Sequence, residues 1–242
     1  INKLICKIIL MNKNKKKIGI IVDSLQVSKQ IYDLIKNSQK SNNYYIHTLL
    51  INKNNNIGLF EKSILFLKEK GILKLISRLL FIVVSKIERI IILKRKPYLK
   101  KFFRKYNLND FNLEKIYIEP IRGNDFFTYE YTKNDLLKIN SIGLDMAISG
   151  IKGLFKGEIL ETFPEGIICF NFKENEYYNA NTVAFWEVFY RDPKTLLTIY
   201  RITKENKSGE FLINGYIQTS WLYTLNLIKI YQISNLIINK IL

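Results

Sequence analysis

The feature that most constrains the fold is a continuous run of mainly β-branched residues, Ile18-Gly19-Ile20-Ile21-Val22-Asp23. A run without alternation between apolar and polar residues is typical of a parallel strand covered on both faces. Ser24 is suited to cap a following helix, and residues 44–51 supply a second strand. The apolar residues of that helix recur at helical spacing: Val27, Ile31, Leu34 and Ile35. The chain is therefore expected to open with a β-α-β unit.

The same alternation resumes in the second half of the chain. Strands are expected at 115–120, 144–149 and 166–170, and helices at about 133–142 and 156–162. This order predicts an α/β fold, a Rossmann-like and mostly parallel sheet with helices on both faces. A helix at 183–190, a strand at 195–202, a turn at 206–209, a strand at 211–218 and a terminal helix from Trp221 are expected to follow.

The domain organisation follows from these segments. Residues 1–16 read as an N-terminal extension, 17–218 as the α/β domain and 219–242 as a C-terminal helix. Residues 1–10 are apolar and dotted with Lys, but no small-residue cleavage site follows a long apolar region, so no signal peptide is expected. Whether these ten residues belong to the native protein is left open.

A basic helical insertion is expected at about 60–105. Its apolar core contains Leu79-Leu80-Phe81-Ile82-Val83-Val84, but Lys and Arg interrupt it too often for a spanning helix. The pattern fits an amphipathic helix, for which packing on the core is favoured over a peripheral membrane contact. Residues 94–105 are expected to form an exposed connection.

The chain carries 38 Lys and Arg against 21 Asp and Glu, a net charge of +17. Such a balance suits a polyanionic partner, but most of the excess is Lys scattered among Asn and Ile, which favours a solvated surface. A nucleic-acid partner is not expected, because it would rest on net charge alone. With 48% hydrophobic residues, the composition also excludes a chain that is disordered throughout.

Cysteine and histidine are scarce. The two cysteines, Cys6 and Cys169, do not indicate a disulfide framework, which fits a reducing, cytoplasmic compartment. The single histidine, His47, lies in an expected strand, where a core or edge position is favoured over a catalytic one. These residues cannot supply a Cys/His zinc cluster, so no metal site is predicted from them, and a site built from carboxylates is the alternative left open.

Several segments together carry a family resemblance. They are Asp145-Met146-Ala147-Ile148-Ser149-Gly150, residues 157–160 and 166–170, the Phe185-Trp186-Glu187-Val188 stretch, and residues 192–195, 198–199 and 208–210. In this order they resemble the formyltransferase family that uses 10-formyltetrahydrofolate. The resemblance is closest to a bacterial branch with a Phe-Trp-Glu-Val segment, whose members are often part of longer chains, so a further C-terminal domain is a candidate. It covers 115–218 well and the opening β-α-β unit loosely.

The family's Asn, His and Asp triad falls on Cys169, Asn171 and Lys207. In the family the His and Asp manage protons while the Asn amide stabilises the oxyanion, so the resemblance implies that this machinery is replaced. Glu174 and Glu210 are candidate substitute bases, with exposed loop charges as the alternative reading. The resemblance also implies 10-formyltetrahydrofolate as cofactor, with Ile148, Gly150 and Ile168 as its binding positions.

The sequence is therefore consistent with two functions. The first is a formyltransferase-like domain acting on an amine of a small-molecule substrate, such as a nucleotide-linked amino sugar, with its activity in doubt. The second is a non-catalytic interaction module that uses the basic helix to meet a membrane or a partner.

Overall fold

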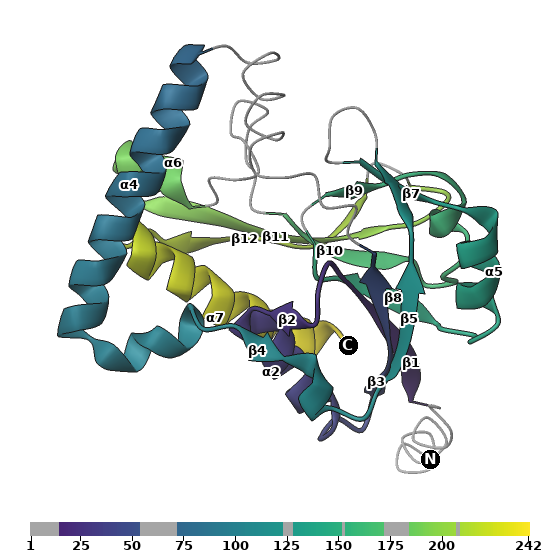
Figure 1. The fold of residues 1–242 in the computed structure, drawn as a ribbon. Helices are drawn as coiled ribbons and strands as arrows, with labels where there is room; N and C mark the ends of the chain where they lie inside the picture. The colour runs from purple at the N-terminus through teal and green to yellow at the C-terminus, as the bar shows by residue number, and fades with distance from the viewer. Residues whose placement is uncertain (1–14, 54–71, 123–127, 152, 172–183, 207–208) are drawn as a thin grey trace, which may run out of the picture.

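The computed structural model describes residues 15–53, 72–122, 128–151, 153–171, 184–206 and 209–242 (Figure 1). Its main sheet has seven strands in the order β12-β11-β10-β8-β1-β3-β5. β1 (Lys16–Val22), β3 (Tyr44–Asn52), β5 (Glu114–Ile118), β8 (Met146–Ser149) and β10 (Ile167–Asn171) are parallel. β11 (Lys194–Ile202) runs antiparallel between β10 and β12 (Glu210–Gln218). The predicted mostly parallel α/β sheet is confirmed.

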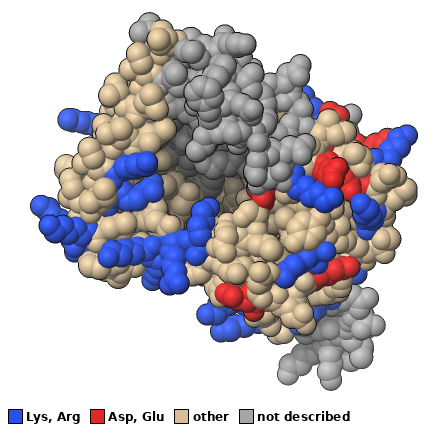
Figure 2. Space-filling model, in the orientation of Figure 1, with Lys and Arg blue, Asp and Glu red and all other residues tan. Residues whose placement is uncertain are grey.

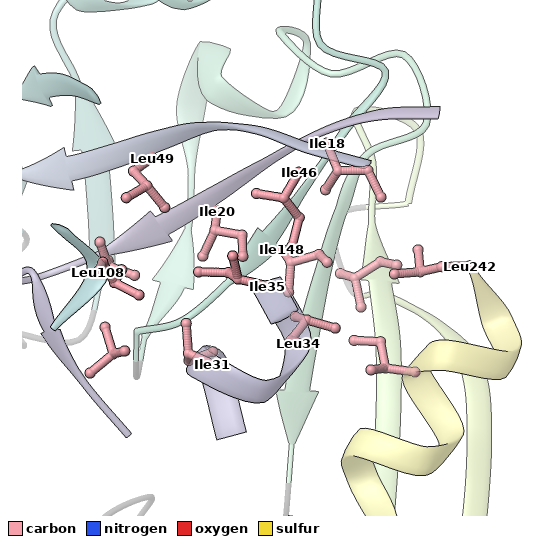
Figure 3. Packing of buried hydrophobic residues seen from close by; sticks show 14 of the residues in the cluster. Ile18, Ile20, Ile31, Leu34, Ile35, Ile46, Leu49, Leu108, Ile148 and Leu242 are labelled. Atoms are coloured by element: carbon pink, nitrogen blue, oxygen red, sulfur yellow. The ribbon is translucent and has the colours of Figure 1, made fainter. Parts of the chain in front are cut away.

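The central strands are buried on both faces, as their composition predicts. Ile20 and Ile148 join a core layer with α2 (Lys29–Ser38) and the end of α7 (Tyr223–Ile241) (Figure 3). Ile21 belongs to the opposite layer, which contains residues of α5 (Lys133–Asn140). Helices therefore cover both faces of the sheet, because neighbouring residues of one strand point to opposite sides.

Several sequence-derived elements differ in their boundaries. The N-cap residue of α2 is Ser28 and not Ser24. The Ser24 hydroxyl instead accepts a hydrogen bond of 2.8 Å from the Gln26 amide, within a turn. Val27 lies in β2 (Gln26–Val27), which pairs with β4 (Tyr106–Asn107), and is not part of the helix. Ser24 was thus the wrong cap, because a long-range strand pairing occupies the residues after it.

The strand predicted at 115–120 is divided. β5 ends at Ile118, and Pro120 begins β6 (Pro120–Arg122), which pairs with β7 (Thr128–Tyr131) in a small three-stranded sheet with β9 (Leu154–Phe155). The helix predicted at 156–162 is a single 3-10 turn, η3 (Gly157–Leu160). Gly157 adopts a φ of 76° at its start, a conformation outside the right-handed helix.

The basic insertion contains α4 (Ile72–Arg95), followed by the 3-10 helix η1 (Pro97–Phe102) in the stretch predicted as an exposed connection. α4 lies along one side of the molecule, next to α7 and the short α6 (Phe185–Phe189) (Figure 1). In the part of the chain that the structure describes, every helix is too short or too polar to cross a bilayer.

Candidate functional site

The topology directs attention to one place on the sheet. The chain passes from β1 to its neighbour β3, and later returns to pair β8 with the other side of β1. In open α/β sheets, ligands bind beyond the carboxyl ends of the strands at such a reversal of strand order. The candidate site is therefore the edge formed by the described residues at the carboxyl ends of β1, β3, β8 and β10.

A chain of three polar side chains lies at this edge. Asp23 follows β1, and its Oδ1 accepts a hydrogen bond of 2.9 Å from Nδ2 of Asn52, the last residue of β3. Asn52 is 2% exposed, and its Oδ1 accepts from the hydroxyl of Tyr131 at 3.0 Å. Asn52 is therefore held at both ends of its amide, and it fixes the position of the half-buried Asp23 carboxylate. None of these three residues is among those predicted from the sequence.

The sequence contained one signal for Asp23 and Asn52: Asp23 directly follows the strand predicted at 18–22, and Asn52 directly follows the strand predicted at 44–51. In a parallel sheet such residues meet at one edge. The contribution of Tyr131 had no local signal, since Asn52 and Tyr131 are 79 positions apart and belong to different sheets.

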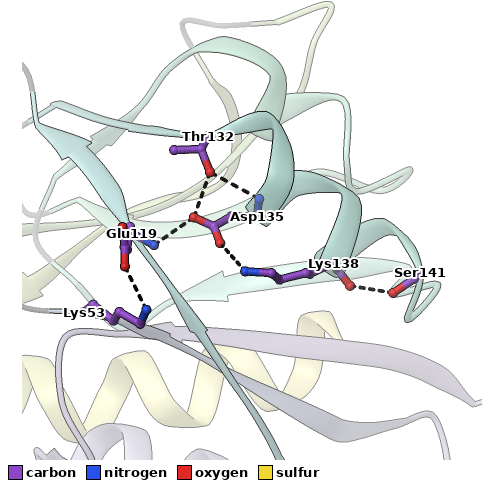
Figure 4. Close-up of polar contacts among 6 residues, drawn as sticks. All are labelled: Lys53, Glu119, Thr132, Asp135, Lys138 and Ser141. Atoms are coloured by element: carbon purple, nitrogen blue, oxygen red, sulfur yellow. Dashed lines mark hydrogen bonds and ion pairs between the residues drawn. The ribbon is translucent and has the colours of Figure 1, made fainter.

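A second polar network closes the β3–β5 end of the same edge (Figure 4). The Asp135 carboxylate of α5 accepts from the Glu119 amide and the Thr132 hydroxyl, both at 3.0 Å, and from Lys138 Nζ at 3.0 Å. Burial acts to raise the pKa of Asp135, but the Glu119, Lys138 and Thr132 hydrogen bonds outweigh it and hold the pKa below its ordinary value. Lys53 and Glu119 form an exposed ion pair beside it at 2.7 Å. This network anchors α5 to the sheet.

The end of β8 is closely packed against β1. The Gly150 amide donates to the Ile21 carbonyl at 2.8 Å, and a Cβ on Gly150 would lie 2.9 Å from that oxygen. Ser149, 4% exposed, donates from its hydroxyl to the Ile151 carbonyl at 3.0 Å. Gly150, one of the predicted cofactor-binding positions, thus has a packing role at this edge. Only Gly allows the ends of β8 and β1 to approach so closely.

Cys169, which the sequence resemblance matches to the family's Asn, is 2% exposed and belongs to the core layer of α5. Burial raises the pKa of its thiol to about 12, and hydrogen bonds with Tyr200 and Ser149 lower it only in part. Burial also raises the pKa of the Tyr200 hydroxyl far above its ordinary value. The thiol is therefore protonated near neutral pH and acts as a packing group between two hydroxyls.

The other predicted catalytic positions are placed only in part. Asn171 is the last residue of β10 and pairs with Thr198, but its side chain lies outside the described residues, as do Glu174 and Lys207. Glu210 begins β12, where its carboxylate accepts from the Arg201 guanidinium at 2.6 Å and is half exposed. Of the predicted site residues, the described part brings together Cys169 and Ile168 on β10 with Ile148 on β8 and Gly150 directly after it. Glu210 lies on β12, two strands from β10.

The described residues do not supply a folate pocket at the predicted positions. The side chains of Ile148 and Ile168 are 0% and 1% exposed and lie in the core layer of α2. Their backbones pair with each other between β8 and β10, and the Gly150 amide is already used. Among the described residues, no group of three or more His, Cys, Asp and Glu is arranged to hold a metal ion.

The single histidine has the structural position that the sequence favours. His47 lies on β3, half exposed, with Nδ1 2.7 Å from the Thr48 hydroxyl and 3.3 Å from a Glu114 carboxylate oxygen. These neighbours belong to β3 and to the adjoining edge strand β5. His47 therefore lies on a strand, as the sequence predicts, at a half-exposed position of β3, which pairs with β1 and β5.

The structure also contains an open groove of about 500 Å³ away from this edge, between α2, α7 and η1. Lys29, Lys36 and Lys101 line it together with Asp33, and Lys29 pairs with Asp33. It is a surface groove between helices, and none of the predicted site residues lines it.

Neither family models nor curated proteins match this sequence. Solved structures do match over most of the chain. Phosphoribosylglycinamide formyltransferase from Bacillus halodurans has a TM-score of 0.54 and 9% identity, covering 93% of this chain and 92% of its own. The enzymes from Brucella melitensis and Campylobacter jejuni have TM-scores of 0.52 and 0.51 and identities of 10% and 11%. They cover 94% and 93% of this chain, and 96% of their own in both cases.

These matches confirm the fold that the resemblance implied: the chain has the α/β fold of phosphoribosylglycinamide formyltransferases. At such low identity the likeness extends to the fold alone.

Proposed function

We propose that this protein binds a small polar ligand at the carboxyl edge of its sheet and does not transfer formyl groups at the rate of an intact formyltransferase. The observation that carries the proposal is the burial of the Cys169 thiol. This thiol is buried between Tyr200 and Ser149 at the position that the sequence resemblance matches to the family's oxyanion-stabilising amide. A protonated, buried thiol is a weak hydrogen-bond donor and is not a general base near neutral pH.

The polar groups at the edge support a ligand with hydroxyl or amine donors. The Asp23 carboxylate is half-buried and held by Asn52, which is itself fixed by Tyr131. A preorganised carboxylate binds such donors well, because little side-chain freedom is lost on binding. An amino sugar carries both kinds of donor. The Asp23 carboxylate therefore favours a nucleotide-linked amino sugar as the ligand class. It gives less support to 10-formyltetrahydrofolate.

Calorimetric titration tests the ligand site. We expect a nucleotide-linked amino sugar to bind, Asp23→Asn to weaken it by about tenfold or more, and Asp33→Asn to leave it unchanged. Asp33 is a suitable control because its carboxylate pairs with Lys29 on α2, in the surface groove. Binding of neither amino sugars nor a reduced folate would remove the proposal, and tight folate binding would restore the cofactor.

A second candidate function is a non-catalytic interaction module. The specific observation that favours it is the outer surface of α4, which is apolar and faces away from the body of the molecule. It does not depend on the ligand site at the sheet edge.

A further inference from the structure

The amphipathic helix α4 is oriented with its apolar side outward. Nine large aliphatic side chains on this side are between 47% and 67% exposed: Ile72, Ile76, Leu79, Leu80, Val83, Val84, Ile87, Ile90 and Ile91. We call these nine residues the α4 outer face. With a rise of about 1.5 Å per residue, the face is about 30 Å long. An apolar surface of this length is uncommon on a monomeric soluble domain and marks an interaction site.

The opposite side of α4 makes the contacts with the body, and several of them are polar. Glu88 accepts hydrogen bonds from the amides of Thr224 and Tyr223, at 2.6 and 3.3 Å. The Arg89 guanidinium lies 4.3 Å from the centre of the Phe103 ring. The helix is thus fixed in rotation by its inner side, and the outer face cannot turn inward without breaking these contacts.

The described charged side chains of α4 and η1 that are exposed to solvent are all cationic. The α4 sequence contains a single carboxylate, Glu88, and that group faces inward. Exposed cations accompany the outer face and continue past its end: Lys86, Lys94, Arg95, Lys96, Lys100 and Lys101. Figure 2 shows Lys and Arg gathered over the lower half of this side of the molecule.

We propose that the α4 outer face docks on an anionic lipid bilayer, with α4 lying in the plane of the interface. An interfacial helix places apolar side chains among the acyl chains while neighbouring Lys and Arg meet acidic headgroups. The arrangement found here meets both needs. The helix is also too polar to span a bilayer, so the body would remain on one side of it.

Charge favours a bilayer over a second copy of the chain. Two outer faces in contact would bring together the cations that flank them, Lys86 and Lys94 among them, in a protein whose net charge is +17. Like charges at an interface oppose association. On an anionic bilayer, by contrast, each of these cations is attracted to the acidic headgroups and strengthens binding.

Cosedimentation with vesicles tests the proposal with the full chain. Vesicles of phosphatidylcholine alone are compared with vesicles of equal parts phosphatidylcholine and phosphatidylglycerol, across a salt series. We expect binding to the anionic vesicles only, falling as salt screens the headgroups. Equal binding to both kinds of vesicle, or to neither, overturns the proposal.

Two variants separate the apolar and charged contributions. Val83→Gln with Ile87→Gln is expected to weaken vesicle binding by at least about tenfold. Leu137→Gln, which changes a similarly exposed leucine on α5, is expected to leave it unchanged. Lys86→Gln with Lys94→Gln is expected to weaken binding by about fivefold per charge, and Lys133→Gln with Lys156→Gln serves as the control.

The oligomeric state distinguishes the main rival. Sedimentation velocity without lipid is expected to show a monomer for the wild type and for the Val83→Gln, Ile87→Gln variant alike. A wild-type dimer that this variant converts to a monomer would assign the outer face to contact between copies and overturn the lipid proposal. Far-ultraviolet circular dichroism confirms that each variant remains folded.

Discussion

Glu88, in the third turn from the end of α4, accepts a hydrogen bond of 2.6 Å from the amide of Thr224 in the first turn of α7. The same carboxylate accepts from the Tyr223 amide at 3.3 Å. α7 lacks a side-chain cap of its own, since its N-cap residue is Leu222. One helix therefore caps another that begins 135 residues later, and the contact joins the basic insertion to the C-terminal helix.

Glu88→Ala is expected to lower the free energy of unfolding by about 1–2 kcal/mol, as for loss of an N-cap. Glu88→Gln retains an acceptor oxygen and loses only the attraction between the charge and the helix dipole, about 0.3–1 kcal/mol. Urea denaturation measures both, with the exposed Glu205→Ala as the control. Equal losses for Ala and Gln would contradict capping through a hydrogen bond.

The Asp135 network predicts a pH-dependent contribution to stability. Because the pKa of Asp135 is lower in the folded state, its stabilisation is fully present above the unfolded pKa of about 3.9 and is lost as pH falls through the folded pKa. We expect Asp135→Asn to cost about 1–3 kcal/mol at pH 7, and the difference from wild type to shrink below about pH 4.

Urea denaturation at a series of pH values checks this, with Asp110→Asn as the control. Asp110 is exposed, and its change is expected to stay within about 0.5 kcal/mol. A difference between wild type and Asp135→Asn that is constant down to acid pH would show that the network acts through packing rather than through the charge.

The Cys169 thiol is expected to be unreactive in the folded protein. A pKa of about 12 leaves roughly a thousandfold less thiolate at pH 8 than an unperturbed cysteine has, and burial blocks access as well. In a Cys6→Ser background, a disulfide reagent such as dithiobisnitrobenzoate should label Cys169 only after denaturation. Fast labelling of the native protein would mean that this position opens to solvent, and the packing role would be wrong.

Formyl transfer is expected to be absent or far below that of an intact family member, because proton-handling and oxyanion groups each contribute on the order of a hundredfold or more. A 10-formyltetrahydrofolate assay with amino-sugar acceptors measures this. The triple change Cys169→Asn, Asn171→His and Lys207→Asp restores the family's residues, and groups that act as a unit are strongly non-additive. Measurable turnover is therefore expected only in the triple variant.

Because Cys169 is buried, the triple variant needs a control for the stability of Cys169→Asn. An Asn amide there has the Tyr200 and Ser149 hydroxyls as neighbours, and an amide left unpaired would cost about 1–3 kcal/mol. The thermal midpoint of Cys169→Asn alone shows whether the amide is accommodated. Robust formyl transfer by the unmodified protein would mean that other residues carry the chemistry.

The sequence by itself determined the layered α/β architecture. Strands buried on both faces are mainly apolar without alternation, so residues 18–22 identify β1 without any tertiary information. Residues 44–51 identify β3 in the same way, although His47 and Thr48 interrupt the apolar run. A helix predicted at about 133–142 similarly identifies α5, and the structure shows Thr132 as its N-cap, which accepts from the Asp135 amide. These signals are local, because each depends only on residues within one element.

Only the tertiary structure decided which residues meet at the candidate site. The contact between Asp23 and Asn52 requires the parallel pairing of β1 with β3, and the Tyr131 contact requires the small second sheet. The burial of Cys169 likewise depends on Tyr200 in the neighbouring antiparallel strand. Spacing along the chain does not encode such contacts.

The orientation of α4 shows the same limit. Its sequence establishes that one side is apolar and the other polar, which favoured packing of the apolar side on the core. The tertiary structure reverses this for most of the helix, although Ile92 is buried against Leu99 and Ile228. The physical reason is that Glu88 and Arg89 find partners on the body, in the α7 amides and the Phe103 ring, so the side of α4 that carries these two residues faces inward.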